Sequence, residues 1–235
     1  MRTRRSRYKV APAISIDTES EFTSWNNDST VSVSVSDNGG SGLSSLYYKF
    51  GATSCGASDG TVVTVNGTSY SIPVPSGIAA GSNLCVYAVD ALSQANTQYK
   101  FLNIDNVNPS ISIDTGSEFT SWNNDATVGI NVADSGSGVG SIYYKWGATS
   151  CSASNGTALT VVSGGGYTLN VPSNTPAGTN LCIYAGDNVA NSTSTYKFLY
   201  IDNVAPSITI DTGSQFTSWS NDTTVVHSRH HSQRS

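Results

Sequence analysis

Carboxylates are the side chains of this sequence with the clearest chemical potential. The chain has 16 Asp and Glu residues against 11 Lys and Arg residues. Asp28, Asp125 and Asp222 recur at an interval of 97 residues, each three positions after a tryptophan. Carboxylates that gather without basic neighbours are ligands for Ca²⁺, which takes about six to eight oxygen atoms. These residues therefore suggest cation binding, provided that the fold brings several of them together.

Catalysis has little support in the sequence. All three histidines lie within residues 227–235, and the Gly-x-Ser-x-Gly motif of serine hydrolases does not occur. A single-segment calcium loop of the EF-hand kind does not occur either. We expect a protein without enzymatic activity, in which any cation site is assembled from separate loops.

A repeat of 97 residues organises the elements that must position these groups. Trp25, Trp122 and Trp219 stand at that interval, which suits an independent sandwich domain of about 100 residues better than a solenoid repeat of about 20 to 50. The interval predicts a first module at 14–105, a linker at 106–110, a second module at 111–202 and the start of a third module at 208–226. We expect the basic leader 1–13 and the basic tail 227–235 to be disordered, and we interpret them as products of a truncated or frame-shifted reading frame.

Composition and charge narrow the class of protein. Gly, Ser, Thr, Asn, Val and Tyr dominate, and this composition indicates an all-β fold. Between Val10 and Val226 there are four lysines, no arginine and all sixteen acidic residues, which gives this segment a net charge of −12. Such a surface argues against nucleic acid and anionic membranes as partners. We find no apolar run long enough to span a membrane, and no signal-peptide core follows the basic leader.

Short strands separated by turn residues fill both modules. Residues Ile14–Asp17 and Thr30–Asp37 alternate apolar and polar side chains, as half-buried strands do. The Asn66-Gly67 dipeptide predicts a two-residue hairpin between its flanking strands. The remaining strands are expected at Leu46–Phe50, Thr61–Val65, Ser69–Val74, Leu84–Asp90 and Gln98–Ile104, and then at Thr127–Asp134, Ile142–Trp146, Ala158–Val162, Tyr167–Val171, Leu181–Asp187 and Thr195–Ile201. This pattern predicts tandem immunoglobulin/fibronectin-III-like antiparallel β-sandwiches, with a barrel as the alternative.

The four cysteines are distributed as one pair in each module. Although four cysteines allow three pairings, one pair per module favours Cys55–Cys85 and Cys151–Cys182. In a sandwich of this kind the third strand runs antiparallel to the sixth, so a cysteine just past the third strand faces one near the start of the sixth. A metal-thiolate site is the alternative, but the chain has no Cys-x-x-Cys spacing. Disulfides imply an oxidising compartment, and we therefore expect an extracellular or cell-surface location.

The up-and-down strand order predicts where the carboxylates gather. The loop after the first strand falls at the C-terminal pole of a module, whereas the loops after the second and sixth strands fall at its N-terminal pole. One junction between modules should therefore collect six carboxylates, and we predict that they form a calcium site: Asp17, Glu21, Asp28, Asp105, Asp134 and Asp187. The alternative is that these residues only cap turns through their own backbone.

Aromatic residues offer two candidate contact surfaces. Tyr47-Tyr48 and Tyr143-Tyr144 each place one ring inward and one outward, which predicts an exposed tyrosine strip on the sheet formed by the third, sixth and seventh strands. The second candidate joins Trp25 and Trp122 with Phe22 and Phe119 in a platform on which sugars could stack. Large aromatics beside a loop more often close the end of a sandwich core, however, so we favour the tyrosine strip.

Two phrases carry a resemblance to a known family. Val86-Tyr87-Ala88-Val89-Asp90 and Ile183-Tyr184-Ala185-Gly186-Asp187-Asn188 each precede a strand and the sequence Ile-Asp-Asn-Val-x-Pro. Together they resemble bacterial Ig-like tandem repeat modules of large surface or adhesin-type proteins, over about residues 14–226. The linker is also similar to the Asp-Asn-x-x-Pro joint of cadherin-like arrays, in which calcium stiffens the hinge. In the first module Asp90-Ala91-Leu92 departs from the Asp187-Asn188-Val189 of the second.

The resemblance implies a structural or adhesive role. We expect a non-enzymatic fragment of an exported bacterial surface protein whose repeats act as a stalk or adhesive arm, with a host, cell-surface or glycan ligand as partner. The alternative is a pair of carbohydrate-binding accessory modules of a secreted enzyme. Calcium is the one cofactor that the sequence suggests.

Overall fold

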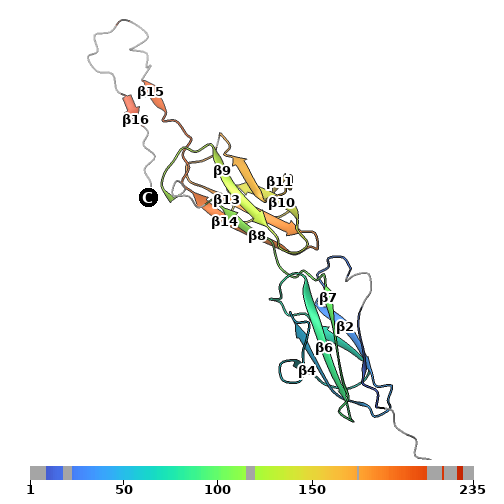
Figure 1. Cartoon of the computed structure of the whole chain (residues 1–235). Helices are drawn as coiled ribbons and strands as arrows, with labels where there is room; N and C mark the ends of the chain where they lie inside the picture. Colours follow the sequence, from blue (N-terminus) through green and yellow to red (C-terminus); the bar gives the residue numbers. More distant parts are fainter. Residues whose placement is uncertain are drawn as a thin grey trace, which may run out of the picture.

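A computed structural model describes residues 9–17, 23–114, 120–173, 175–210, 219 and 227–229 of the 235. Every strand in this part of the chain that pairs in a sheet pairs antiparallel, and no α-helix is present among the described residues. Most of the strands form two successive β-sandwiches, which follow one another along the length of the molecule (Figure 1). The predicted fold class, tandem immunoglobulin/fibronectin-III-like antiparallel β-sandwiches, is confirmed.

The first sandwich packs a three-stranded sheet against a four-stranded one. The smaller sheet has the order β1-β2-β5 and the larger one the order β4-β3-β6-β7. The strands are β1 (Ala13–Ile16), β2 (Thr30–Ser36), β3 (Leu43–Phe50), β4 (Thr61–Val63), β5 (Ser69–Pro73), β6 (Ser82–Asp90) and β7 (Ala95–Leu102).

The second sandwich repeats this arrangement strand for strand. Its two sheets have the orders β12-β9-β8 and β11-β10-β13-β14. The strands are β8 (Ser110–Ile113), β9 (Thr127–Ala133), β10 (Val139–Trp146), β11 (Thr157–Leu159), β12 (Gly166–Asn170), β13 (Thr179–Asp187) and β14 (Ser192–Leu199). A register shift near the start of β3 recurs near the start of β10.

The prediction of a hairpin at Asn66-Gly67 is wrong, because the two flanking strands do not pair with each other. β4 pairs with β3, whereas β5 pairs with β2 in the other sheet, so the residues between them cross from one sheet to the other. Val63 and Val65 pack against the core along this crossing. Partial burial of these valines against the core outweighs the local preference of Asn-Gly for a tight turn.

Each sandwich has its own apolar core between its two sheets. In the first, the alternate residues Val31, Val33 and Val35 of β2 are buried against Leu46 of β3 and Leu84 of β6. In the second, the corresponding positions are occupied by Val128, Ile130, Val132, Ile142 and Leu181. This period of two is what a strand with one buried face requires.

A disulfide reinforces each four-stranded sheet. Cys55 is joined to Cys85 of β6, with a Cα–Cα distance of 6.0 Å, and Cys151 is joined to Cys182 of β13, with a Cα–Cα distance of 5.9 Å. The predicted pairings are therefore confirmed. Each bond ties the loop after the third strand of a sandwich to the start of its sixth strand.

The chain leaves each sandwich in the same way. Ile104 forms a parallel bridge with Asn26, and Ile201 forms one with Asn123. The side-chain amide of Asn106 then donates to the carbonyl oxygen of Asp28, at 3.1 Å. At the second exit Asn203 donates to Asp125 at the same distance. The start of each linker is thereby fixed to the sandwich that it leaves.

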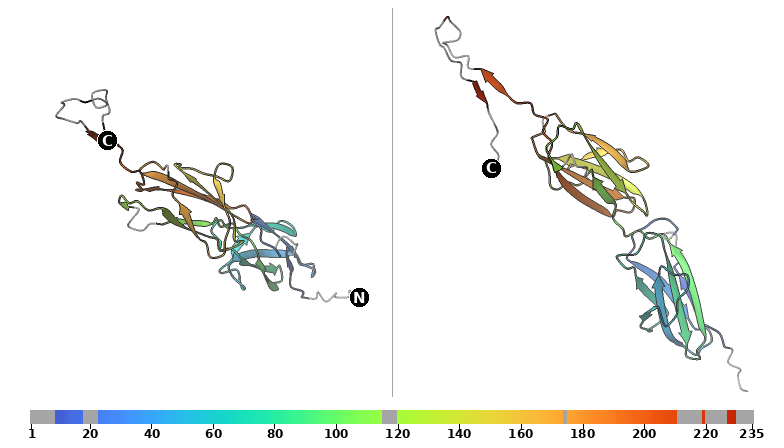
Figure 2. Two further views of the ribbon diagram at one scale, coloured as in Figure 1. Left: turned by 90° about the horizontal axis from the view of Figure 1, so that it is seen from above. Right: turned by 60° about the vertical axis from the view of Figure 1, so that its left-hand side comes forward.

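Beyond the second sandwich the structure describes two short strands, β15 (Ile208–Ile210) and β16 (His227–Arg229), which pair antiparallel. They lie apart from the two sandwiches in all three views (Figures 1 and 2). β16 belongs to the segment expected to be a disordered tail, and most of residues 208–226 fall outside the described part of the chain. In the described residues no helix is both long enough and apolar enough to cross a membrane.

Candidate metal centre

Three carboxylates meet where the linker enters the second sandwich. Asp105 follows the last bridge of the first sandwich, Asp134 follows β9 and Asp187 is the last residue of β13. One carboxylate oxygen from each residue lies within 4.8 Å of the others. β9 and β13 both end at this pole, so two strand ends of the second sandwich and the exit from the first converge on one point.

Asp105 is held in place by the second sandwich. Its side chain is fully buried, and its Oδ2 accepts a hydrogen bond of 2.6 Å from the backbone N–H of Ser137. The amide of Asn191 donates to the backbone carbonyl of Asp105 at 2.7 Å. These contacts reach across 32 and 86 residues, and they attach the linker to the loops on both sides of the pole.

The other two carboxylates are also bound by their own loops. Asp187 Oδ1 accepts from the backbone N–H groups of Val189 and Asn191, and its Oδ2 accepts from the Asn191 amide. Asp134 Oδ2 accepts from the N–H groups of Gly136 and Gly138. Within the described chain, every donor that reaches the three carboxylates is neutral. At an effective dielectric of about 20, each pair of charges at this separation repels by about 3 to 4 kcal/mol.

Two polar atoms at the centre lack a hydrogen-bond partner. They are Oδ1 of Asp134 and Oγ of Ser137, and both are buried. A buried carboxylate oxygen without a donor is costly, because nothing replaces the water that it has lost. Oxygen atoms of this kind are the donors that calcium takes, so the residues present fit a calcium ion better than they fit a site filled only by protein.

Close packing around Gly136, where the linker meets the second sandwich, leaves no room for a side chain at this position. A Cβ added there would strike the Asp105 carboxylate and would lie 2.6 Å from the Cβ of Ala80 in the first sandwich. Glycine at this position therefore lets the linker carboxylate and the first sandwich approach the turn closely.

The matching pole of the first sandwich is arranged differently. Asp37 and Asp90 occupy the places of Asp134 and Asp187, but both oxygens of Asp37 are occupied by its own turn, through Gly39, Ser41 and Gly42. Desolvation raises the pKa of Asp37, but these hydrogen bonds together outweigh it and leave the pKa below the ordinary value.

Two of the six predicted ligands are not brought into the group. The three clustered carboxylates do not include Asp17 or Asp28. Asp17 follows β1, where its carbonyl accepts from Lys100 Nζ at 2.7 Å, and Asp28 accepts from Asn106 through its own carbonyl. Glu21 lies outside the described residues.

Several residues at this centre were not expected from the sequence. Asn188 and Asn191 supply amide donors to the pole, Asn188 to the carbonyls of Ser137 and Gly138, and Ser137 binds the linker. These two asparagines could have been recognised from the sequence, because the first sandwich has no asparagine at either place. It reads Asp90-Ala91-Leu92-Ser93-Gln94 where the second reads Asp187-Asn188-Val189-Ala190-Asn191.

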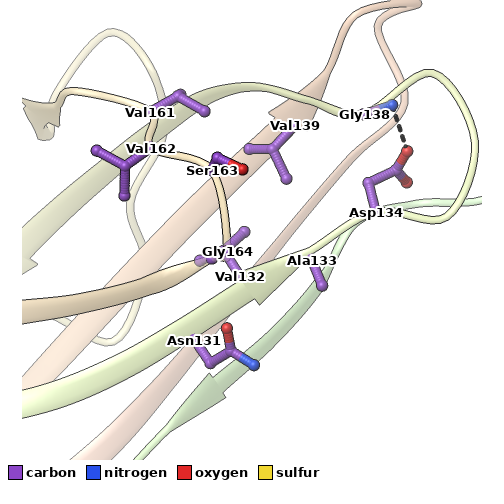
Figure 3. A pocket seen from close by; sticks show the side chains of 11 residues that line it. Asn131, Val132, Ala133, Asp134, Gly138, Val139, Val161, Val162, Ser163 and Gly164 are labelled. Atoms are coloured by element: carbon purple, nitrogen blue, oxygen red, sulfur yellow. Dashed lines mark hydrogen bonds between the residues drawn. The ribbon is translucent and has the colours of Figure 1, made fainter.

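A shallow hollow borders the centre on the second sandwich. Its volume is about 550 Å³, and it lies between β9 and the loop that precedes β12. Figure 3 shows Asp134 at its rim with the hydrogen bond to Gly138, while Val161 and Val162 cover the opposite side. The orphaned Asp134 oxygen makes the centre, rather than this open valine-lined hollow, the better cation site.

The four tyrosines of the predicted strip are all half-buried, and they alternate between the two faces of the sheet. Tyr48 and Tyr144 pack against the cores. Tyr47 lies opposite Tyr87, with ring centroids 6.2 Å apart, and Tyr143 lies opposite Tyr184 at 6.1 Å. Any contact made by the strip would therefore use Tyr47 and Tyr143.

Comparisons with known proteins give the following result. No family model and no curated protein matches the chain. Among solved structures, fibronectin(III)-like modules of Clostridium thermocellum CbhA match over 80% of this chain and 95% of theirs, at 11% identity and a TM-score of 0.30. A Ca²⁺-stabilised adhesin, with which an Antarctic bacterium binds ice, matches over 88% of this chain at 15% identity and a TM-score of 0.32. The chain spans 54% of that structure.

Proposed function

We propose that this protein is a non-enzymatic stalk or adhesive arm of an exported bacterial surface protein, and that calcium at the joint stiffens it. The observation that supports the proposal is the meeting of Asp105, Asp134 and Asp187, which come from both sides of the joint. An ion bound there would tie the exit of the first sandwich to two strand ends of the second. The ion would neutralise the repulsion among the carboxylates and fix the angle between neighbouring sandwiches.

The division into modules belongs to the same proposal. We infer that 14–105 and 111–202 are independent units, because each range contains its own core and its own disulfide. The disulfides also support an extracellular or cell-surface location. The outward rings of Tyr47 and Tyr143 are the proposed contact points for a surface partner.

Thermal unfolding of the full chain with calcium and with chelator tests the metal centre. We expect calcium to raise Tm, because an ion at a hundred times its Kd stabilises the folded state by about 2.7 kcal/mol. Asp134→Asn should abolish this calcium-dependent rise, because it replaces the carboxylate whose Oδ1 has no partner.

Asp37→Asn is the matched control. It makes the same change at the equivalent pole of the first sandwich, where both oxygens are already bound by the turn, so the calcium-dependent rise should persist. An unchanged Tm on adding calcium to the unaltered chain, or equal responses in both variants, would refute the proposed centre.

A further inference from the structure

A row of exposed aromatic rings on the second sandwich lies outside the metal centre. We call it the aromatic ledge and define it as Trp122, Phe198 and Tyr200. Their exposed fractions are 41%, 43% and 37%. Tyr200 lies edge-on to both of its neighbours, with ring centroids 5.4 Å from Trp122 and 5.1 Å from Phe198. Rings that brace one another in this way lose little freedom when a ligand binds.

The local fold explains why these rings face solvent. Leu199 of β14 points into the core, so Phe198 points outward and Tyr196 follows on the same face two residues away. Trp122 is brought beside them because Asn123 bridges to Ile201 and donates its N–H to the Tyr200 carbonyl. Trp122 therefore does not close the end of the core, which was the favoured sequence-based interpretation.

Gly178 makes room for the ledge. A Cβ there would lie 2.7 Å from the Phe198 ring and 3.1 Å from the Trp122 ring. The backbone of Gly178 also has φ near 68°, a conformation that favours glycine. A side chain at this position would displace the two rings.

The first sandwich carries a smaller version of the same surface. Trp25 and Phe101 are 38% and 52% exposed, and a Cβ on Gly81 would touch both rings. Asn103 stands at the place of Tyr200, so the bracing ring is missing. The chain thus presents two related aromatic surfaces, one on each sandwich.

The size and chemistry of the ledge limit what it can bind. Three rings that are about two-fifths exposed offer roughly 250 Å², far below the roughly 800 Å² that each partner contributes to a stable protein interface. None of the three side chains is charged, so the ledge provides no ion pair for a charged ligand. An open ledge would also leave a lipid chain largely in water.

We propose that the aromatic ledge binds a neutral polysaccharide, whose sugar rings lay their C–H faces on the aromatic rings while their hydroxyls stay hydrated. A polymer also suits the repetition, because one chain that reaches both sandwiches gains avidity from two weak sites. This inference goes beyond the stalk function and does not rest on calcium, since the three rings and Gly178 make no part of the metal centre.

Affinity electrophoresis of the full chain tests the proposal. The probes are gels containing a soluble β-1,4-glucan derivative, a mixed-linkage β-glucan, a xylan, a galactomannan or dextran, with heparin as the charged comparison. We expect at least one neutral polymer to retard the protein, with or without chelator. Trp122→Ala should weaken that retardation by about tenfold, as expected for the loss of one stacking ring.

Exchanging the residues at positions 103 and 200 distinguishes a loss of binding from a folding defect, because one change should weaken binding and the other should strengthen it. Tyr200→Asn installs the residue found at the same place in the first sandwich and should weaken binding, whereas Asn103→Tyr should strengthen it. Val62→Ala removes an exposed apolar side chain of β4 that belongs neither to the tyrosine strip nor to an aromatic surface, and it should leave binding unchanged. Circular dichroism checks that each variant is folded.

Four results would overturn the proposal. They are no retardation by any neutral polymer, retardation by heparin alone, a Val62→Ala variant that loses binding while Trp122→Ala retains it, and a dimer in light scattering that Trp122→Ala dissociates. The last result would assign the ledge to contact between copies of this chain.

Discussion

Asp134 differs from its counterpart Asp37 in what its two oxygens contact. Asp37 is enclosed by its own turn, whereas the shorter turn after Asp134 directs the N–H of Ser137 to Asp105 and leaves Oδ1 of Asp134 without a donor. The turn after Asp134 is one residue shorter, and its Ser137 N–H binds the linker carboxylate of Asp105. The two aspartates have the same strand position, but the turn that follows them differs, and Tyr8 stands before the first sandwich where Asp105 stands before the second.

A surface ion pair gives a test of residue-scale electrostatics. Lys49 Nζ lies 2.9 Å from Asp59 Oδ2. The hydrogen bond from Lys49 and a second one from the Gly56 N–H lower the pKa of Asp59. A carboxyl group whose pKa is lower in the folded state stabilises the fold above its unfolded pKa of about 3.9, and this stabilisation is lost as the pH falls through the folded pKa.

We expect an NMR titration of Asp59 to show a midpoint below that of an ordinary aspartate. Lys49→Met should move the midpoint upward, because it removes the largest cause of the shift. Lys145→Met is the control, since Asn155 takes the place of Asp59 beside that lysine in the second sandwich. An Asp59 midpoint that stays the same in Lys49→Met would contradict this assignment.

At the scale of elements, periodicity predicted the strands well. The alternating valines of Thr30–Ser36 determine which face of β2 turns inward, and the largely apolar run of Ser82–Asp90 indicates a strand that is buried along most of its length. The pairing of β4 and β5 could not be obtained in this way, because Asn66-Gly67 is a local signal and the choice of partner depends on the core. Leu102 and Leu199 point inward, and strand alternation therefore places Phe101 and Phe198 on the outside.

The disulfides should contribute most of their stability through the unfolded chain. The bonds enclose separations of 30 and 31 residues, for which loop entropy gives a stabilisation of about 3 to 4 kcal/mol each. Urea unfolding of the Cys151→Ala/Cys182→Ala double variant should show a loss of this size. Cys55→Ala/Cys85→Ala should lose a similar amount, because the two loops are almost equally long. A loss below about 1 kcal/mol in both variants would contradict this expectation.

At the scale of the whole molecule, the joint is where sequence reasoning was least complete. Strand order alone placed Asp105, Asp134 and Asp187 at one pole, and the structure brings them together. Asp17 and Asp28 were assigned to the same pole but are not in the cluster. Strand order assigns a residue to a pole but not to a contact, whereas the hydrogen bonds from Ser137 and Asn191 bind Asp105 to the loops that carry the other two carboxylates.

Gly136→Ala tests whether close packing at the joint fixes the arrangement of the two sandwiches. The added Cβ cannot fit against Asp105 and Ala80, so the sandwiches should separate or tilt. Small-angle X-ray scattering should show a changed maximum dimension. Gly39→Ala makes the equivalent change in the first sandwich, where the nearest neighbours of the added Cβ are Asp37 and Val10. It should leave the scattering curve unchanged. Identical curves for Gly136→Ala and the unaltered chain would contradict a tightly packed joint.

The two covalent cross-links also set how far the protein can be pulled. If tension unravels a sandwich, the 30 or 31 residues between its cysteines remain tied off and cannot lengthen. At about 3.3 to 3.6 Å per residue, each bond withholds roughly 100 Å of extension. With both disulfides intact the chain would therefore yield in short steps, and reducing agents would make every step longer.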